Sequence, residues 1–243
     1  MKNWPKILIP FLITFAIGGI YLFIVFKHRQ DPGTVNHKQP EQKLTADDVA
    51  VVRMEFPQHF EDTLDLQGKS VWMKNGNSMP YYPYAGGHVN FAKQVGLLPP
   101  NQRLDIKKII KAVAPASVRD NVEHGDKQAM AIFTLPDNPD QKAQFALPIG
   151  YMQGQQEAYY GDILFYYDDP HTIYSHWPKD TWSAIDAHQV KPGMNELQAS
   201  MALGMKIHVD GEKQGDRIVD YDVNGKHTSV TFQHDKATSI QAQ

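Results

Sequence analysis

The chain has 243 residues, no cysteine and a formal net charge of −3. Without cysteine it cannot form a disulfide-stapled fold or a thiolate site such as a zinc finger or an iron–sulfur cluster. Its 17 Gly, 16 Pro, 11 Tyr, 11 Phe and 4 Trp argue against a collagen-like, coiled-coil or fully disordered chain. The length suits one large domain or two small ones, since domains typically have about 100–150 residues.

The N-terminal segment carries the strongest local signal. After a short tail of residues 1–6, residues 7–26 form an uncharged run made mostly of Ile, Leu, Val and Phe. At about 1.5 Å per residue, such a run spans the roughly 30 Å hydrocarbon core of a bilayer. A cleaved signal peptide would have a shorter apolar region, of about 7–15 residues, that ends at small residues. We therefore expect an uncleaved transmembrane helix, with the lipid bilayer as its partner.

The residues on either side of this helix predict its orientation in the membrane and a linker after it. Basic residues flank the run on both sides, so the charge bias is nearly even. Because the tail is short and the rest of the chain lies behind the helix, we expect a single-pass membrane protein with a cytoplasmic N-terminus and an extracytoplasmic globular part. Residues 27–60 are rich in charged residues, Pro, Gly and Asn, a composition typical of a linker.

Residues 61–189 are expected to form a β-rich unit, because short β segments alternate there with turn-prone stretches. The predicted strands are Ser70–Met73 and residues 128–135, 144–151 and 156–167. Residues 104–113 carry the only basic cluster (Lys107, Lys108 and Lys111), and we interpret them as a helix with a solvated basic face. Pro178 favours the start of a helix over residues 179–188.

Residues 190–243 are expected to form a helix followed by a β-meander. Asn195 and Gln198 have the spacing of a capping box at a helix start. The Asn224-Gly225 pair stands between two runs of alternating apolar residues, which is a strong hairpin signal. The predicted strands are residues 217–223, 226–232 and 237–240. The fold class is therefore α+β: one N-terminal transmembrane helix, a mainly antiparallel β unit and a helix-plus-meander unit.

The start of this last unit resembles a known family. Gly193-Met194-Asn195 followed by Leu203-Gly204 is similar to the SmpA/OmlA, or BamE-like, group of small outer-membrane-assembly lipoproteins, in which Gly-Met and a capping residue open a helix that ends in Leu-Gly. The chain departs from the pattern at Lys206, where the family usually has proline, and in lacking the lipidated cysteine. The resemblance covers residues 190–240 and implies helices on an antiparallel sheet, in an extracytoplasmic envelope protein that works through contacts rather than chemistry. Residues 61–180 resemble no family.

Residues 159–182 are the segment richest in side chains that can do chemistry. Histidine and carboxylate ligands hold hydrolytic zinc or manganese ions. Asp169, His171 and His176 can converge on such an ion if the segment around Pro170 forms a turn. Their spacing, however, matches no known metal motif. The alternative is that Asp169 caps a turn and the neighbouring aromatic residues cover the edge of the core.

The same segment offers a candidate binding surface, formed by Tyr166, Tyr167, Tyr174, Trp177 and Trp182. A few aromatic anchors can supply most of the affinity for a protein partner, and aromatic rings can also stack on the sugars of a glycan. Carboxylates outnumber basic residues beyond residue 60, which argues against a nucleic-acid partner.

We therefore expect a membrane-anchored, non-enzymatic binding or scaffold protein of the cell envelope, without a cofactor, whose partner is an envelope protein or a glycan. Two alternatives remain open. One is a metal-dependent hydrolase of an envelope polymer, with Zn or Mn held by Asp169, His171 and His176. The other is a glycan-binding module.

Overall fold

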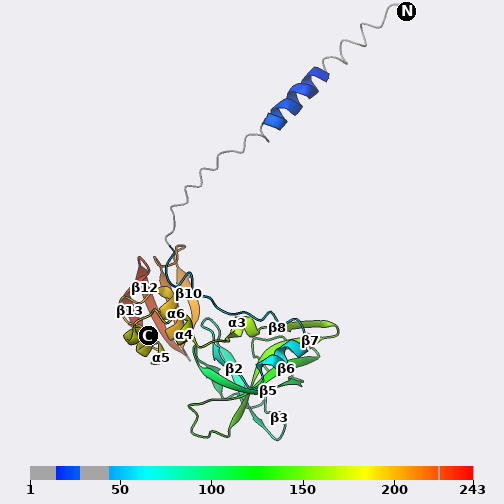
Figure 1. Ribbon diagram of the computed structural model, residues 1–243, viewed down its shortest axis with the longest axis vertical. Helices are drawn as coiled ribbons and strands as arrows, with labels where there is room; N and C mark the ends of the chain where they lie inside the picture. The colour runs from blue at the N-terminus through cyan, green and yellow to red at the C-terminus, as the bar shows by residue number, and fades with distance from the viewer. Residues whose placement is uncertain (1–14, 28–43, 224, 243) are drawn as a thin grey trace, which may run out of the picture. The chain divides into compact units, whose positions relative to one another are not determined.

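The computed structural model describes residues 15–27 and 44–242, apart from residue 224. The chain divides into two units, Met1–Thr45 and Ala46–Gln243. The second unit contains two antiparallel sheets, and Figure 1 shows the larger one in cyan to green and the smaller one in orange to red. The expected α+β class with antiparallel sheets is confirmed for this unit.

The predicted transmembrane helix is wrong. The described part of the first unit is a helix over residues 15–27, which is shorter than the about 20 residues that a span needs. Within residues 15–27 and 44–242, no helix combines the length and the apolar character required to cross a bilayer. Residues 7–14 of the predicted span lie outside the described residues. The prediction that this uncleaved helix serves as a signal anchor is therefore also wrong.

The larger sheet has nine strands in the described part of the chain, in the order β3-β2-β7-β6-β5-β1-β9, with β4 paired to β2 and β8 to β7. The strands are β1 (Ser70–Met73), β2 (Met79–Ala85), β3 (His88–Val89), β4 (Gly96–Leu98), β5 (Arg103–Ala112), β6 (Lys127–Thr134), β7 (Gln144–Gln153), β8 (Gln156–Tyr159) and β9 (Phe165–Tyr166). The strand predicted over residues 156–167 is two strands, because the short helix α3 (Gly161–Leu164) interrupts it.

The helix predicted over residues 104–113 is also wrong, since this segment is strand β5. Leu104 and Ile106 face the main core of the sheet, and a register shift between Ile106 and Lys108 adds one residue to the strand. Beyond this bulge, Ile109 faces the same core. The bulge therefore changes a strict period of two into a spacing that resembles a helix.

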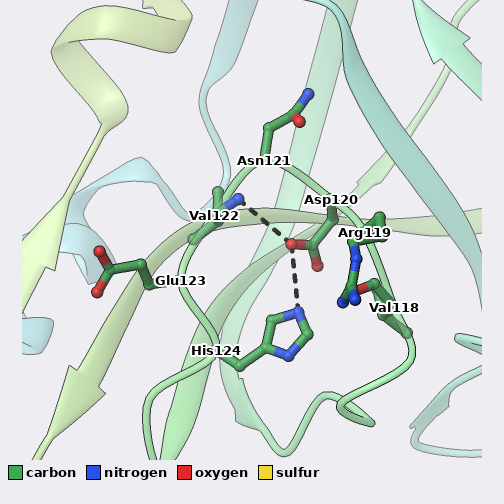
Figure 2. Close-up of a pocket in the computed structure, with 7 residues that line it drawn as sticks. All are labelled: Val118, Arg119, Asp120, Asn121, Val122, Glu123 and His124. Carbon is green, nitrogen blue, oxygen red and sulfur yellow. Dashed lines mark hydrogen bonds and ion pairs between the residues drawn. The ribbon is translucent and has the colours of Figure 1, made fainter.

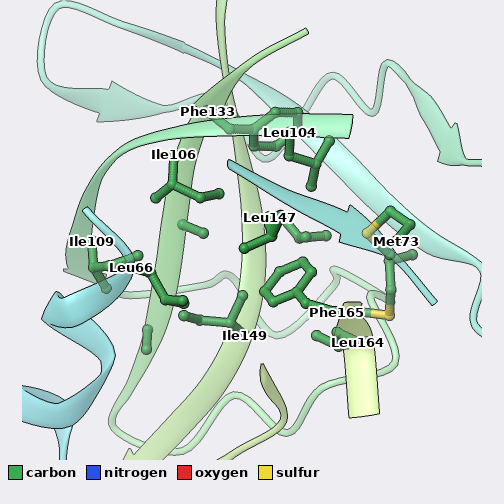
Figure 3. Close-up of a cluster of buried hydrophobic side chains, with 14 of the residues drawn as sticks. Leu66, Met73, Leu104, Ile106, Ile109, Phe133, Leu147, Ile149, Leu164 and Phe165 are labelled. Atoms are coloured by element: carbon green, nitrogen blue, oxygen red, sulfur yellow. The ribbon is translucent and has the colours of Figure 1, made fainter. Parts of the chain in front are cut away.

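The two faces of the larger sheet bury separate apolar clusters. Figure 3 shows the main cluster, in which Phe133, Leu147 and Phe165 meet, and α2 (Phe60–Thr63) and the 3-10 helix η1 (Leu64–Leu66) close it. On the opposite face, the buried residues Tyr82, Met130 and Ile132 pack against Val89 of β3 and against Phe91 and Val118 of two connecting segments. Because both faces of β6 are buried, its sequence is a continuous apolar run rather than an alternating one.

The smaller sheet has the order β10-β11-β12-β13. Its strands are β10 (Met205–Asp210), β11 (Ile218–Val223), β12 (Lys226–Gln233) and β13 (Lys236–Ala242), and the helices of this part are α4 (Pro170–Ile173), α5 (Lys179–Asp186) and α6 (Glu196–Leu203). The predicted capping box is confirmed, since Asn195 and Gln198 exchange side-chain to backbone hydrogen bonds at the start of α6. The three predicted strands correspond to β11, β12 and β13, whereas β10 was not predicted.

Residues 46–60 of the predicted linker are folded onto the second unit. The side chains of Ala50 and Val52 pack against the core of the smaller sheet. The carboxylate of Asp162 accepts hydrogen bonds from the backbone N–H groups of Glu55 and Phe56, each at 2.8 Å. We refer to residues 46–56 as the strap.

A buried carboxylate joins α6 to the smaller sheet. Glu196, the first residue of α6, is 0% exposed. Its Oε1 accepts hydrogen bonds from Arg217 Nη2 at 2.6 Å and Lys206 Nζ at 2.5 Å, and its Oε2 accepts from Arg217 Nε at 3.0 Å and the Gly215 N–H at 3.1 Å. Burial alone would raise the pKa of Glu196, but these hydrogen bonds outweigh it and lower the pKa to about 2.

We predict that the chain loses stability between about pH 5 and pH 2. The pKa of Glu196 is about 2 in the folded chain, against about 4.3 for an unfolded glutamate. Its contribution, about 3 kcal/mol, is therefore present above the unfolded pKa and lost as the pH falls through the folded one. Urea unfolding between pH 2 and pH 7 measures this, and Glu196→Gln should remove the share of the acid dependence that Glu196 contributes. An unchanged pH slope in Glu196→Gln would contradict the assignment.

Candidate functional site

The five aromatic residues expected on a binding surface lie in the core. Each is between 4% and 7% exposed: Tyr166, Tyr167, Tyr174, Trp177 and Trp182. The rings of Tyr174 and Trp177 stack with their centroids 4.5 Å apart, and the Trp177 and Trp182 centroids are 5.2 Å apart. Aromatic side chains bury large apolar areas, and here they fill the interior instead of forming a platform for a protein or for sugar rings.

The three residues predicted as alternative metal ligands do not converge: Asp169 contacts His171, whereas His176 contacts Asp47. Asp169 caps α4 by accepting a hydrogen bond from the His171 N–H, and its Oδ1 lies 2.9 Å from His171 Nδ1. His176 instead places its Nε2 2.5 Å from Oδ1 of Asp47. Within the described ranges, no group of three or more His, Cys, Asp or Glu side chains is arranged to hold a metal ion.

Asp47 of the strap is a structural residue that the sequence did not reveal. Besides His176, its Oδ1 accepts a hydrogen bond from Trp177 Nε1 at 2.6 Å, and its Oδ2 accepts one from Asn195 Nδ2 at 2.6 Å. One carboxylate thus joins the strap, the connection between α4 and α5, and the residue that caps α6. No local pattern indicates it, because its partners lie about 130–150 residues away in the sequence.

We predict that Asp47→Ala destabilises the chain by about 3 kcal/mol, because it leaves three donors without their charged acceptor. Asp210→Ala is the matched control. Asp210 is exposed and accepts no side-chain bond from the described residues, so this change should stay within about 0.5 kcal/mol. Urea unfolding measures both variants, and equal effects would show that Asp47 does not hold the strap.

An open pocket of about 410 Å³ lies on the connection between β5 and β6 (Figure 2). It is lined by Val118, Arg119, Asp120, Asn121, Val122, Glu123 and His124. Asp120 is 1% exposed and accepts hydrogen bonds from the Val122 N–H at 3.3 Å and from Gln128 Nε2 at 3.2 Å. Figure 2 shows the His124 ring turned toward this carboxylate, with 3.6 Å between Nε2 and Oδ1.

This cavity combines a buried carboxylate with a half-buried imidazole. Burial and the nearby charge of Asp120 raise the pKa of Tyr82 to about 12. A carboxylate that orients an imidazole can serve proton transfer, but no hydroxyl or thiol nucleophile is present among the seven lining residues. The seven lining residues thus include a carboxylate and an imidazole 3.6 Å apart but no side-chain nucleophile.

The outer strand β10 is the most open apolar element of the smaller sheet. It pairs only with β11, all six of its residues are exposed, and no further backbone hydrogen bond from the described residues reaches it. Met205, Ile207 and Val209 are 37%, 44% and 37% exposed. A register shift between Lys206 and His208 introduces a bulge. Bulges and charged residues protect edge strands from unspecific pairing, and β10 has both, in the bulge and in Lys206 and Asp210.

No family model matches the chain, and no match was found among curated proteins or solved structures. The resemblance of residues 190–240 to BamE-like lipoproteins therefore stays a prediction.

Proposed function

We propose that the chain is a non-enzymatic binding protein that takes up an extended segment of a partner protein along β10. The observation that carries this proposal is the edge of β10 that no strand among the described residues pairs with, together with its three exposed apolar side chains. A free edge offers a row of N–H and C=O groups to an incoming strand. In strand addition, these main-chain bonds supply affinity and the side chains along the edge supply specificity.

The edge is held in place before any partner arrives. The ladder with β11 fixes one side of β10, and the contact between Lys206 and Glu196 ties the strand to α6. A preformed edge lowers the entropy that binding must overcome, because the strand does not have to become ordered first.

The two sides of β10 favour different residues in the partner. Lys206 and Val209 are opposite the buried residues Tyr221 and Val219, so they face the core side of the sheet. His208 and Asp210 face the other side. Asp210 forms no ion pair with the described residues, so a partner with apolar residues on one side and a basic residue on the other complements the edge.

The cell-envelope location and the non-catalytic role expected from the sequence are parts of this proposal, and the membrane anchor is not. Of the two partners expected from the sequence, we propose the protein and not the glycan, because the aromatic residues that would bind sugar rings lie in the core.

We predict that Ile207→Lys weakens peptide binding about tenfold or more. Random dodecapeptides displayed on phage are selected against the full chain, and the affinity of the enriched peptides is measured by fluorescence anisotropy. A lysine at this edge position removes an apolar contact and opposes strand pairing. The matched control is Ile218→Lys, because Ile218 is 39% exposed but lies on β11, which is paired on both sides.

The control should change the affinity by less than about threefold. Failure to enrich any peptide, or equal losses in the two variants, would contradict strand addition at β10.

A further inference from the structure

A second cavity, of about 190 Å³, opens at the first residue of β10. Its apolar wall is formed by Met79, Val122, Ile163, Leu164 and Met205. It is smaller than the roughly 300–1,000 Å³ of sites for drug-sized ligands, so its volume suits a single side chain. None of the described lining residues is an acid, a lysine or an arginine, which favours an uncharged side chain.

Two asparagines form the polar rim of this cavity. Asn77 Nδ2 donates a hydrogen bond to the carbonyl oxygen of Ile163 at 2.8 Å, and Asn121 Nδ2 donates one to that of Ser78 at 3.2 Å. These bonds fix the two side-chain amides. Their Oδ1 atoms accept no hydrogen bond from the described residues, so both can accept an N–H group from a ligand backbone.

The cavity and strand β10 share one residue. Met205 is both the first residue of β10 and part of the cavity wall. A chain paired along β10 as far as Met205 therefore ends next to a residue of the cavity wall. Strand-addition sites commonly obtain their specificity from such side-chain pockets next to the edge.

We propose that this cavity is the anchor site of the same partner segment and takes one leucine, isoleucine, methionine or phenylalanine side chain. The Oδ1 atoms of Asn77 and Asn121 accept N–H groups of the partner's backbone beside that residue. This inference rests on the proposed strand addition at β10, since the anchored residue is the one that follows the paired strand.

The test uses the full chain and the same displayed dodecapeptide library. The enriched peptides should share a large apolar residue at a fixed distance from an alternating stretch. Replacing that residue by aspartate in a synthetic copy of the peptide should weaken binding about tenfold or more, as expected for a buried anchor. This comparison needs no altered protein.

The matching change in the protein is Ile163→Arg at the rim of the cavity. Ile163 is 58% exposed, so the fold should tolerate the change, whereas the cavity becomes blocked and charged. Val113→Arg is the matched control, since Val113 is 70% exposed and lines neither this cavity nor the one around Asp120. We expect a loss of about tenfold for Ile163→Arg and less than about threefold for the control.

The outcomes separate the two proposals. Suppose that Ile207→Lys weakens binding, but that Ile163→Arg and the aspartate substitution in the peptide do not. This result overturns the anchor site and leaves strand addition intact. If Ile163→Arg weakens binding and Ile207→Lys does not, both the anchor site and strand addition are overturned. The cavity would then take an apolar group that is not part of a strand on β10. Enrichment of peptides without a shared apolar residue also overturns the anchor site.

Discussion

The carboxylate of Glu196 is the contact on which the open edge of this protein depends. It is buried at the start of α6 and is satisfied by Lys206 on β10, by Arg217 just before β11 and by the Gly215 N–H between them. A buried charge is tolerated only when its partners are all in place. The helix, the connection and the first two strands of the smaller sheet must therefore be positioned together, and β10 gains a support that an edge strand with one neighbour would otherwise lack.

The aromatic residues and the strap support the same region from behind. Tyr174, Trp177 and Trp182 fill the core beneath α5 and α6, and Asp47 ties the strap to the residue that caps α6. These three aromatic residues are buried in the core and so support the shape of the sheet. Met205, Ile207 and Val209 of β10 keep more than a third of their surface exposed, and Met205 also lines the cavity of about 190 Å³.

Features of the fold that depend on neighbouring residues could be predicted from the sequence, and features that depend on distant residues could not. The Asn195 capping box and the strands beside Asn224-Gly225 are local patterns, so they were found. The bulge in β5 hid a strand because it shifts the apolar period. In β10, the alternation of Met205, Ile207 and Val209 was a usable signal, but whether the strand has one neighbour or two is decided by chain topology. The contacts of Asp47 have no local signature.

The most direct test of the open edge is residue-by-residue amide hydrogen exchange in the free chain, followed by NMR. In a strand paired on one side, alternate N–H groups point into the ladder and away from it. We expect alternate amides of β10 to exchange quickly while those of β11 are protected, and we expect a bound peptide to protect the fast ones. Protection of every β10 amide in the free chain would show that the edge is already covered, and would contradict the proposed function.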